Sequence, residues 1–220
     1  MMTKTVQRPR RSQADRSAAA RAAFVAAAIT VLSEQGFARA TSVAIAEQAG
    51  FSTGALHHHF ATKEDLFMAV LDDLTTHVIA LFMDLREEQS ADADLAVTSV
   101  ESLWAVYGEG AYWAVWEINI GWRSDKSLCK QLADHRRRSR DRLNAAIHSN
   151  SFLSDRTKST LLALLPFILS AMRGMFLETF ASREELFQSQ LDILAGLLKA
   201  RLDEAGAARR QRHCRANKVR

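Results

Sequence analysis

Residues that break helices are scarce in this chain. Only two prolines and nine glycines occur among 220 residues, of which 48% are hydrophobic. Val, Ile and Thr seldom alternate with polar residues, so patterns typical of strands are weak. Apolar residues recur instead at helical spacing. We therefore expect an all-α protein whose core is built as one domain or as two closely packed parts.

Capping residues and changes in composition suggest four segments. The predicted boundaries are a flexible basic arm (1–14), a first helical domain (15–62), a larger helical domain (63–208) and a basic tail (209–220). Asp15 or Ser17 is expected to cap the first helix, which Gly36 ends. Thr62 with Asp65 forms a capping-box pair that opens a long fourth helix. Further helices are expected at about 95–107, 112–122, 126–148, 155–180 and 183–205.

Two short capped helices follow the first one. Thr41 caps a helix from Ser42 to Ala49 that Gly50 ends, and Ser52 caps another that reaches about Phe60. This spacing predicts a helix-turn-helix, although an ordinary helical hairpin would give the same spacing.

The residues of this stretch favour the first alternative. The segment 41–66 resembles the DNA-binding region of TetR-family repressors. The positions that match the family pattern are Thr41, Ile45, Ala46, Ala49, Gly50, Ser52, Gly54, Leu56, His59, Phe60, Lys63 and Leu66. The resemblance implies an N-terminal three-helix DNA-binding domain, joined by the fourth helix to a larger effector-binding and dimerisation domain. It also implies a transcriptional regulator, most simply a ligand-responsive repressor that binds a pseudo-palindromic operator as a homodimer.

Candidate DNA-contacting residues lie at helix N-termini and along the third helix. They are Thr41, Ser52, Thr53, Gly54, Ala55, His57, His58 and Lys63. Thr41 and Ser52 serve as caps, as phosphate contacts, or as both. Gly54 permits either a close approach of DNA or close packing between helices. Lys63 is either a solvated lysine or, beside free N–H groups of a helix N-terminus, part of a phosphate site.

The three consecutive histidines raise the question of a metal site. Neighbouring residues on a helix point about 100° apart, so three adjacent imidazoles cannot converge on one ion. We expect His57 and His58 to face DNA, and His59 and Phe60 to support the helix from inside. His57 stands where the family usually has a phosphate-contacting tyrosine, and an imidazole can also donate to phosphate.

The charged ends of the chain either bind nucleic acid or simply aid solubility. Residues 1–21 hold six Lys/Arg and one Asp, and residues 209–220 hold six Lys/Arg and no acid. The third helix has no arginine, so the commonest guanine contact is missing. Base recognition would then rest on Thr53, Ala55, His58, Arg39 or the N-terminal arm, in which Arg8, Arg10 and Arg11 could enter a minor groove.

All four tryptophans and both tyrosines lie between residues 104 and 122. This cluster forms either a bulky core or the aromatic wall of a pocket for a small apolar or aromatic effector. The candidate ligand-binding residues are Trp104, Tyr107, Trp113, Trp116, Glu117, Asn119, Arg173 and Phe176, with Arg123 and Glu178 as further polar candidates.

The last two helices resemble a family dimer interface. One predicted apolar face contains Phe167, Ile168, Met172, Met175, Phe176 and Phe180. The other contains Leu186, Leu191, Leu194, Leu197 and Leu198. Two such helices from each subunit would form an isologous four-helix interface.

Several function classes find no support in the sequence. No nucleophile–base set, phosphate loop or metal spacing indicates an enzyme, a cofactor or a metal site. Cys129 and Cys214 form no disulfide framework. The apolar run from Leu161 to Met172 contains Pro166 and is too short to span a bilayer. We therefore expect a soluble cytoplasmic protein without a membrane partner.

Overall fold

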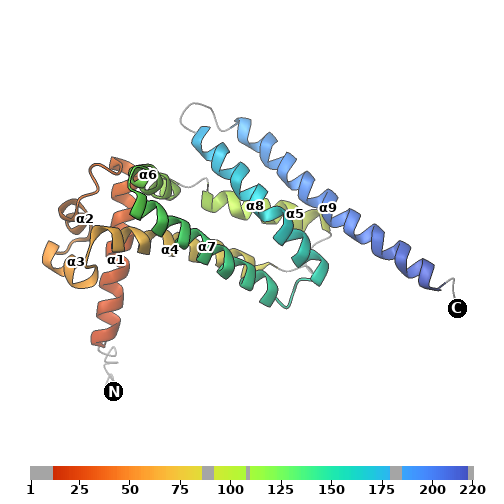
Figure 1. The fold of residues 1–220 in the computed structure, drawn as a ribbon, viewed down its shortest axis with the longest axis horizontal. Helices are drawn as coiled ribbons and strands as arrows, with labels where there is room; N and C mark the ends of the chain where they lie inside the picture. Colours follow the sequence, from red (N-terminus) through yellow and green to blue (C-terminus); the bar gives the residue numbers. More distant parts are fainter. Residues whose placement is uncertain (1–11, 86–91, 108–109, 179–184, 218–220) are drawn as a thin grey trace, which may run out of the picture. The chain divides into compact units, whose positions relative to one another are not determined.

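The computed structural model describes residues 12–85, 92–107, 110–178 and 185–217. Every regular element in these ranges is a helix, so the prediction of an all-α fold is confirmed. The elements, shown in Figure 1, are α1 (Gln13–Gln35), α2 (Ser42–Ala49), α3 (Thr53–His59), α4 (Lys63–Asp84), α5 (Asp92–Tyr107), the 3₁₀ turn η1 (Gly110–Tyr112), α6 (Trp113–Trp122), α7 (Lys126–Ser149), α8 (Asp155–Glu178) and α9 (Glu185–Asn217).

The start of α1 differs from the prediction. Ser12 is the N-cap, and its hydroxyl accepts a hydrogen bond from the Asp15 amide at 3.1 Å. The Asp15 carboxylate in turn accepts from the Ser12 amide at 3.0 Å. These reciprocal bonds form a capping box, in which Asp15 is the third helical residue and neither Asp15 nor Ser17 is the cap. The Ser12 hydroxyl and backbone also lower the pKa of the Asp15 carboxyl.

The chain forms two compact units, and the first contains the three N-terminal helices. It comprises Met1–Asp73 together with Trp113–Asp125. Its core includes Phe24 and Leu32 of α1, Ile45 of α2 and Leu56 of α3, each fully buried. The first half of α4 and the whole of α6 therefore belong to this unit, although the sequence interpretation assigned both to the second domain.

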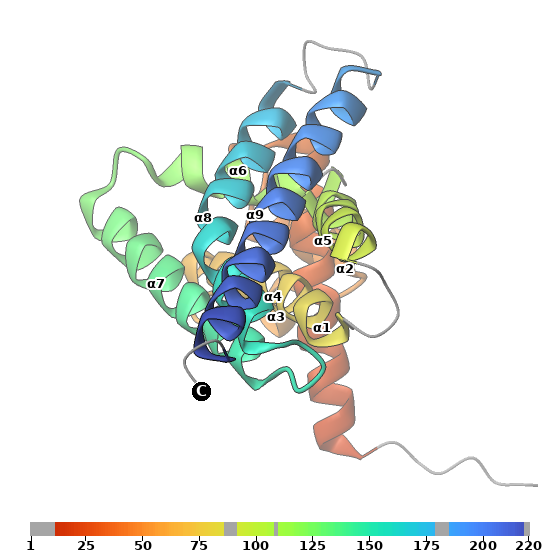
Figure 2. The ribbon, with the colours of Figure 1, turned by 90° about the vertical axis from the view of Figure 1, so that its right-hand side faces the viewer.

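The second unit comprises Leu74–Tyr112 and Lys126–Arg220. Within it α5 packs against α8 and α9, and α7 packs against α8. The two last helices run side by side along most of α8, as Figures 1 and 2 both show. The backbone of α9 continues to Asn217, whereas the sequence predicted an end near Ala205.

A buried asparagine joins two helices inside the second unit. Asn150 follows α7, and its amide nitrogen donates to the carbonyls of Phe82 at 2.8 Å and Leu85 at 3.1 Å. Its side-chain oxygen accepts from the Phe152 amide at 2.9 Å. Carbonyls at a helix C-terminus lack partners within the helix. Asn150, only 1% exposed, therefore satisfies the end of α4 and fixes the turn before α8.

Within the described part of the chain, three helices, α1, α4 and α8, are long and apolar enough to cross a membrane by length and composition alone. The apolar run from Leu161 to Met172 covers only part of α8, so its short length does not decide whether α8 could cross a membrane. The buried residues of α8 are Thr157, Leu161, Leu165, Ile168, Met172, Met175 and Phe176. They recur mostly every three or four positions, the pattern of a helix that packs one face against protein.

Candidate nucleic-acid interface

The helix-turn-helix begins and ends at the predicted residues. The Thr41 hydroxyl accepts from the Ala44 amide, and the Ser52 hydroxyl accepts from the Ala55 amide, both at 3.1 Å. Gly50 ends α2 with φ of 73° and ψ of 27°, a left-handed conformation that L side chains rarely adopt. Its amide donates to the carbonyls of Ala46 and Glu47. These local bonds set the tight turn that separates α2 from α3.

Both capping hydroxyls remain exposed at the surface. A hydroxyl oxygen that accepts from an amide still has a proton to donate. Thr41 and Ser52 therefore act as caps in the free protein and can also donate to a phosphate oxygen. The two roles weighed for these residues are compatible.

The outer side of α3 carries small residues followed by imidazoles. Gly54, His57 and His58 are exposed, and Thr53 and Ala55 are half-buried. A Cβ atom added at Gly54 would meet only the Ser52 hydroxyl among the described residues, at an ordinary 3.9 Å. No close helix packing in this part of the chain thus requires a glycine here. The alternative of close approach by an external molecule is the one that this geometry favours.

The inner side of α3 is held by aromatic contacts. Leu56 is fully buried and Phe60 is 3% exposed. The His59 ring lies 5.7 Å from the Phe24 ring, and the Arg21 guanidinium lies 4.8 Å above the Phe60 ring. His59 and Phe60 therefore support the helix, while His57 and His58 point outward. Among the described residues, no group of three His, Cys, Asp or Glu side chains is arranged to hold a metal.

Lys63 is the first residue of α4. The capping box before it has the predicted form, since the Thr62 amide donates to Asp65 at 3.0 Å and the Asp65 amide donates to Thr62 at 3.1 Å. The Lys63 ammonium lies 5.0 Å from the centre of the Phe37 ring and 5.4 Å from that of the Phe67 ring. These cation–π contacts hold the cation near a helix N-terminus, where anions bind favourably.

The predicted ligand-binding residues are divided between the two units. Trp104, Tyr107, Arg173 and Phe176 lie in the second unit. There three of them contact Tyr112, whose ring centre is 4.4 Å from that of Tyr107 and 5.5 Å from that of Phe176. The Arg173 Nε donates to the Tyr112 hydroxyl at 3.2 Å. Burial, with the neighbouring Tyr107, raises the pKa of the Tyr112 phenol.

Glu178, a further polar candidate for ligand binding, lies five positions after Arg173 on α8. Positions five apart on a helix do not face each other, and Arg173 bonds the tyrosine instead. Phe187, which was not among the candidates, stacks on Trp104 with ring centres 5.6 Å apart. Two buried polar atoms on the same pair of helices, Ser99 Oγ of α5 and Gln190 Oε1 of α9, have no hydrogen-bond partner among the described residues.

The remaining candidates, Trp113, Trp116, Glu117 and Asn119, lie on α6 in the first unit. The Glu117 carboxylate accepts a hydrogen bond from the Phe37 amide at 2.7 Å. Asn119 donates to the Val115 carbonyl, and Arg123 donates to the Ile120 carbonyl. Each of these three polar groups is thus engaged within the first unit. Their predicted role in ligand binding stays a prediction.

Comparison with known proteins gives consistent results. Residues 24–70, from the middle of α1 to the start of α4, match the family described as bacterial regulatory proteins, tetR family. An uncharacterized HTH-type transcriptional regulator of Mycobacterium tuberculosis is 24% identical over 197 residues, which cover 87% of this chain and 99% of that protein.

Solved structures share the fold over most of the chain. The GusR protein of Salmonella enterica aligns with a TM-score of 0.58 and 21% identity, covering 85% of this chain and 95% of that one. The regulator FadR of Bacillus subtilis, solved in complex with stearoyl-CoA, aligns with a TM-score of 0.54 and 15% identity, covering 84% and 96%.

Proposed function

Because the chain belongs to the TetR family of transcriptional regulators and carries a DNA-binding helix-turn-helix, we propose that it represses transcription as a homodimer on a pseudo-palindromic operator. A small effector releases it from the DNA. The observation that carries the DNA-binding part is the outer side of α3, where Gly54 has open space and His57 is exposed. Lys63 adds a cation at the start of α4.

DNA docking assigns a role to each part of this surface. The N-terminal half of α3 enters the major groove, where Thr53 and Ala55 reach base edges and Ala55 suits a thymine methyl group. Phosphate oxygens accept hydrogen bonds from Thr41, Ser52 and His57, and the Lys63 ammonium pairs with a further phosphate. The basic residues of the arm, Arg8, Arg10 and Arg11, lie outside the described residues and have no part in this proposal.

Operator binding can be tested with DNA from the region upstream of the protein's own gene. We expect Lys63→Ala and His57→Ala to weaken binding, and His57→Tyr to preserve it. Lys130→Ala, which removes the same charge from the exposed side of α7, serves as the matched control. Binding should weaken steeply as salt rises, because several phosphates are neutralised. Unchanged affinity in both alanine variants would contradict the docking.

The dimer is proposed to form through exposed stripes of α8 and α9. Most residues expected at the interface are instead buried inside the subunit: Ile168, Met172, Met175, Phe176, Leu191, Leu194 and Leu198. Phe167 and Leu197 are exposed, at 58% and 49%, and the side chains of Phe180 and Leu186 lie outside the described residues. An amphipathic helix in a bundle turns one apolar face inward, and sequence alone does not identify which.

Two outward stripes remain at helical spacing. On α8 the stripe consists of Ala163, Phe167, Ser170, Gly174 and Leu177, and on α9 of Ser189, Ile193, Gly196, Leu197 and Ala200. Small residues beside large apolar ones allow two helix pairs to approach closely in an isologous four-helix interface. A two-fold dimer then matches operator half-sites about 34 Å apart.

The effector is proposed to bind in the second unit beside Tyr112. Two features support this site: the ring cluster around Tyr112, and the Arg173 side chain whose Nε donates to the Tyr112 hydroxyl. Arg173 favours an apolar or aromatic compound that also carries a carboxylate. FadR, which shares this fold, was solved in complex with stearoyl-CoA, and this supports a small-molecule site in the present chain.

Effector binding can be tested by release of labelled operator DNA. A panel that pairs each aromatic carboxylate with its neutral amide would reveal whether a negative charge is needed. We expect Arg173→Gln to raise the effector concentration that gives half release, while DNA affinity without effector stays the same. Trp116→Phe is the comparison for the alternative site on α6. An effect confined to that variant would move the site to the first unit.

A further inference from the structure

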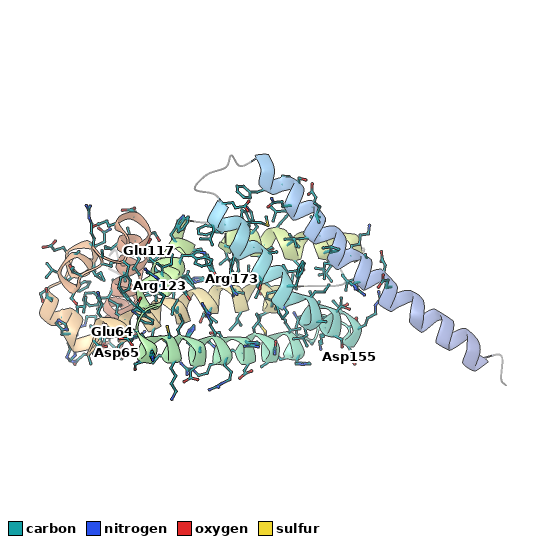
Figure 3. The ribbon with its side chains drawn as sticks, turned by 45° about the horizontal axis from the view of Figure 1, so that its top comes forward. Glu64, Asp65, Glu117, Arg123, Asp155 and Arg173 are labelled. Atoms are coloured by element: carbon teal, nitrogen blue, oxygen red, sulfur yellow. The ribbon has the colours of Figure 1, made fainter. Side chains whose placement is uncertain are left out.

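The turn after α1 is held by a carboxylate from a distant part of the chain. The backbone amide of Phe37 donates to Oε2 of Glu117 at 2.7 Å, although the two residues are 80 positions apart. The same carboxylate lies against Gly36, where an added Cβ atom would be 3.4 Å from Oε2. Glu117, labelled in Figure 3, is half-buried on α6. It therefore ties α6 to the end of α1.

A second contact from α6 seats the ring of Phe37. Gly121 lies one helical turn after Glu117, on the same side of α6. A Cβ atom added at Gly121 would overlap the base of the Phe37 ring, at Cγ, Cδ1 and Cδ2. These atoms cannot swing away as the end of a flexible side chain would. The ring thus rests directly on the α6 backbone, and only glycine at position 121 leaves room for it.

The other neighbours of this ring belong to the start of α4. The Lys63 ammonium lies 5.0 Å from the centre of the Phe37 ring, and the Phe67 ring centre lies 5.7 Å from it. A cation within about 6 Å of an aromatic centroid is attracted to the ring face. Phe37 therefore touches α6 through its amide and ring, and touches the proposed phosphate-binding lysine through its ring face.

We propose that Glu117 and Gly121 are positioning residues for the phosphate contact of Lys63. Glu117 fixes the backbone of Phe37, Gly121 fixes its ring, and the ring holds the Lys63 ammonium at the N-terminus of α4. The inference rests on the proposed DNA-binding function. It gives the Glu117 carboxylate a role in operator affinity instead of contact with an effector.

The experiment measures operator affinity of the full-length protein across a range of salt concentrations. We expect Glu117→Ala and Gly121→Ala each to weaken operator binding about fivefold and to lower the salt slope by about one phosphate per half-site, as Lys63→Ala does. Glu117→Gln keeps an oxygen that accepts from the Phe37 amide, so it should retain most of the affinity and the full slope.

A double-mutant cycle separates positioning from general stability. Combined with Lys63→Ala, the Glu117→Ala change should cause little further loss, because the contact that it positions is already absent. The proposal would be overturned if the double variant lost operator affinity by the product of the two single-variant factors. An unchanged salt slope in Glu117→Ala would also overturn it. If Gly121→Ala does not fold, Phe37→Leu provides the second variant, since it keeps an apolar side chain and removes the ring face.

The failure of the proposed function would look different. If Lys63→Ala itself binds the operator with wild-type affinity and a wild-type salt slope, Lys63 makes no phosphate contact, and Glu117 and Gly121 have no such contact to position. If Lys63→Ala weakens binding while Glu117→Ala and Phe37→Leu do not, Lys63 keeps its role and only the inference about α6 is refuted.

Discussion

Replacing Gly54 by alanine should have opposite effects on the stability of the free protein and on its affinity for operator DNA. Gly54 is the second residue of α3, and its backbone is not among the positive-φ glycines. Among the described residues, the only atom near an added Cβ is the Ser52 hydroxyl at 3.9 Å. Alanine is favoured over glycine inside helices, but less so in the first turn. We expect the free protein to gain about 0.5 kcal/mol, which raises Tm by about 1 to 2 °C.

The same methyl group should weaken operator binding. If the N-terminal half of α3 approaches the DNA backbone closely at Gly54, the extra methyl must displace one of the two surfaces. Inserting a methyl group into a well-packed contact costs about 1 to 3 kcal/mol. That cost corresponds to about 5- to 150-fold weaker binding for each half-site. The variant is thus expected to be more stable than the wild type and poorer at binding its operator.

Two measurements on the same preparation test this expectation. Thermal unfolding gives the change in Tm, and fluorescence anisotropy with labelled operator DNA at fixed salt gives the affinity. Ala145→Gly, at an exposed position of α7, is the control with the opposite expectation, since it should lower Tm and leave affinity unchanged. A more stable Gly54→Ala protein with wild-type affinity would refute the close approach of α3 to DNA. A lower Tm would refute the open space at Gly54.

Three further predictions concern the second unit. Ile193→Glu places a charge in the exposed stripe of α9 and should give monomers by light scattering, whereas Lys199→Glu, outside the stripe, should leave the dimer intact; monomers from both would argue against this interface. Burial raises the pKa of Tyr112, so its contribution to stability is complete below about pH 10 and is lost as pH rises above that value. Tyr112→Phe should therefore flatten the alkaline fall in the free energy of unfolding measured with denaturant, and equal slopes would contradict the linkage. Asn150→Ala leaves the Phe82 and Leu85 carbonyls unsatisfied and should lower the free energy of unfolding by about 2 to 4 kcal/mol. The control Asn144→Ala, at a half-buried position, should lower it by less than about 1 kcal/mol. Similar losses in both variants would show that the Asn150 hydrogen bonds do not stabilise the end of α4.

The parts of the fold that sequence predicts well are those that local bonds determine. The bounds of α2 follow from a threonine cap and a left-handed Gly50, and both signals are contained within ten residues. The start of α1 is encoded in the same way, because Ser12 precedes Asp15 by three positions as in other capping boxes. The predicted cap at Asp15 or Ser17 comes too late in the sequence, because that prediction does not consider Ser12 and Asp15 as a capping-box pair.

The candidate ligand site shows what local signals cannot supply. Tyr112 and Trp113 are adjacent in sequence, yet they belong to different compact units. An aromatic cluster within one stretch of chain therefore does not define one pocket. The bond between Phe37 and Glu117 joins positions 80 residues apart, and the bonds of Asn150 to α4 join positions 65 and 68 apart. Nothing in the spacing of a single sequence indicates such pairs.

The division into units also limits how an effector can influence DNA binding. The chain passes between the units at three points: within α4 after Asp73, before Trp113, and after Asp125. The first crossing is a continuous helix that begins at the proposed phosphate contact of Lys63 and ends where Asn150 binds its carbonyls. The other two crossings border α6, which carries Glu117. An effector near Tyr112 must favour one state of these connections over another, because only a difference in affinity between two states couples the two sites. We therefore expect the residues that transmit that difference to lie at the two ends of α4 and on α6, whereas the rings proposed to contact the effector would determine only which compound is bound.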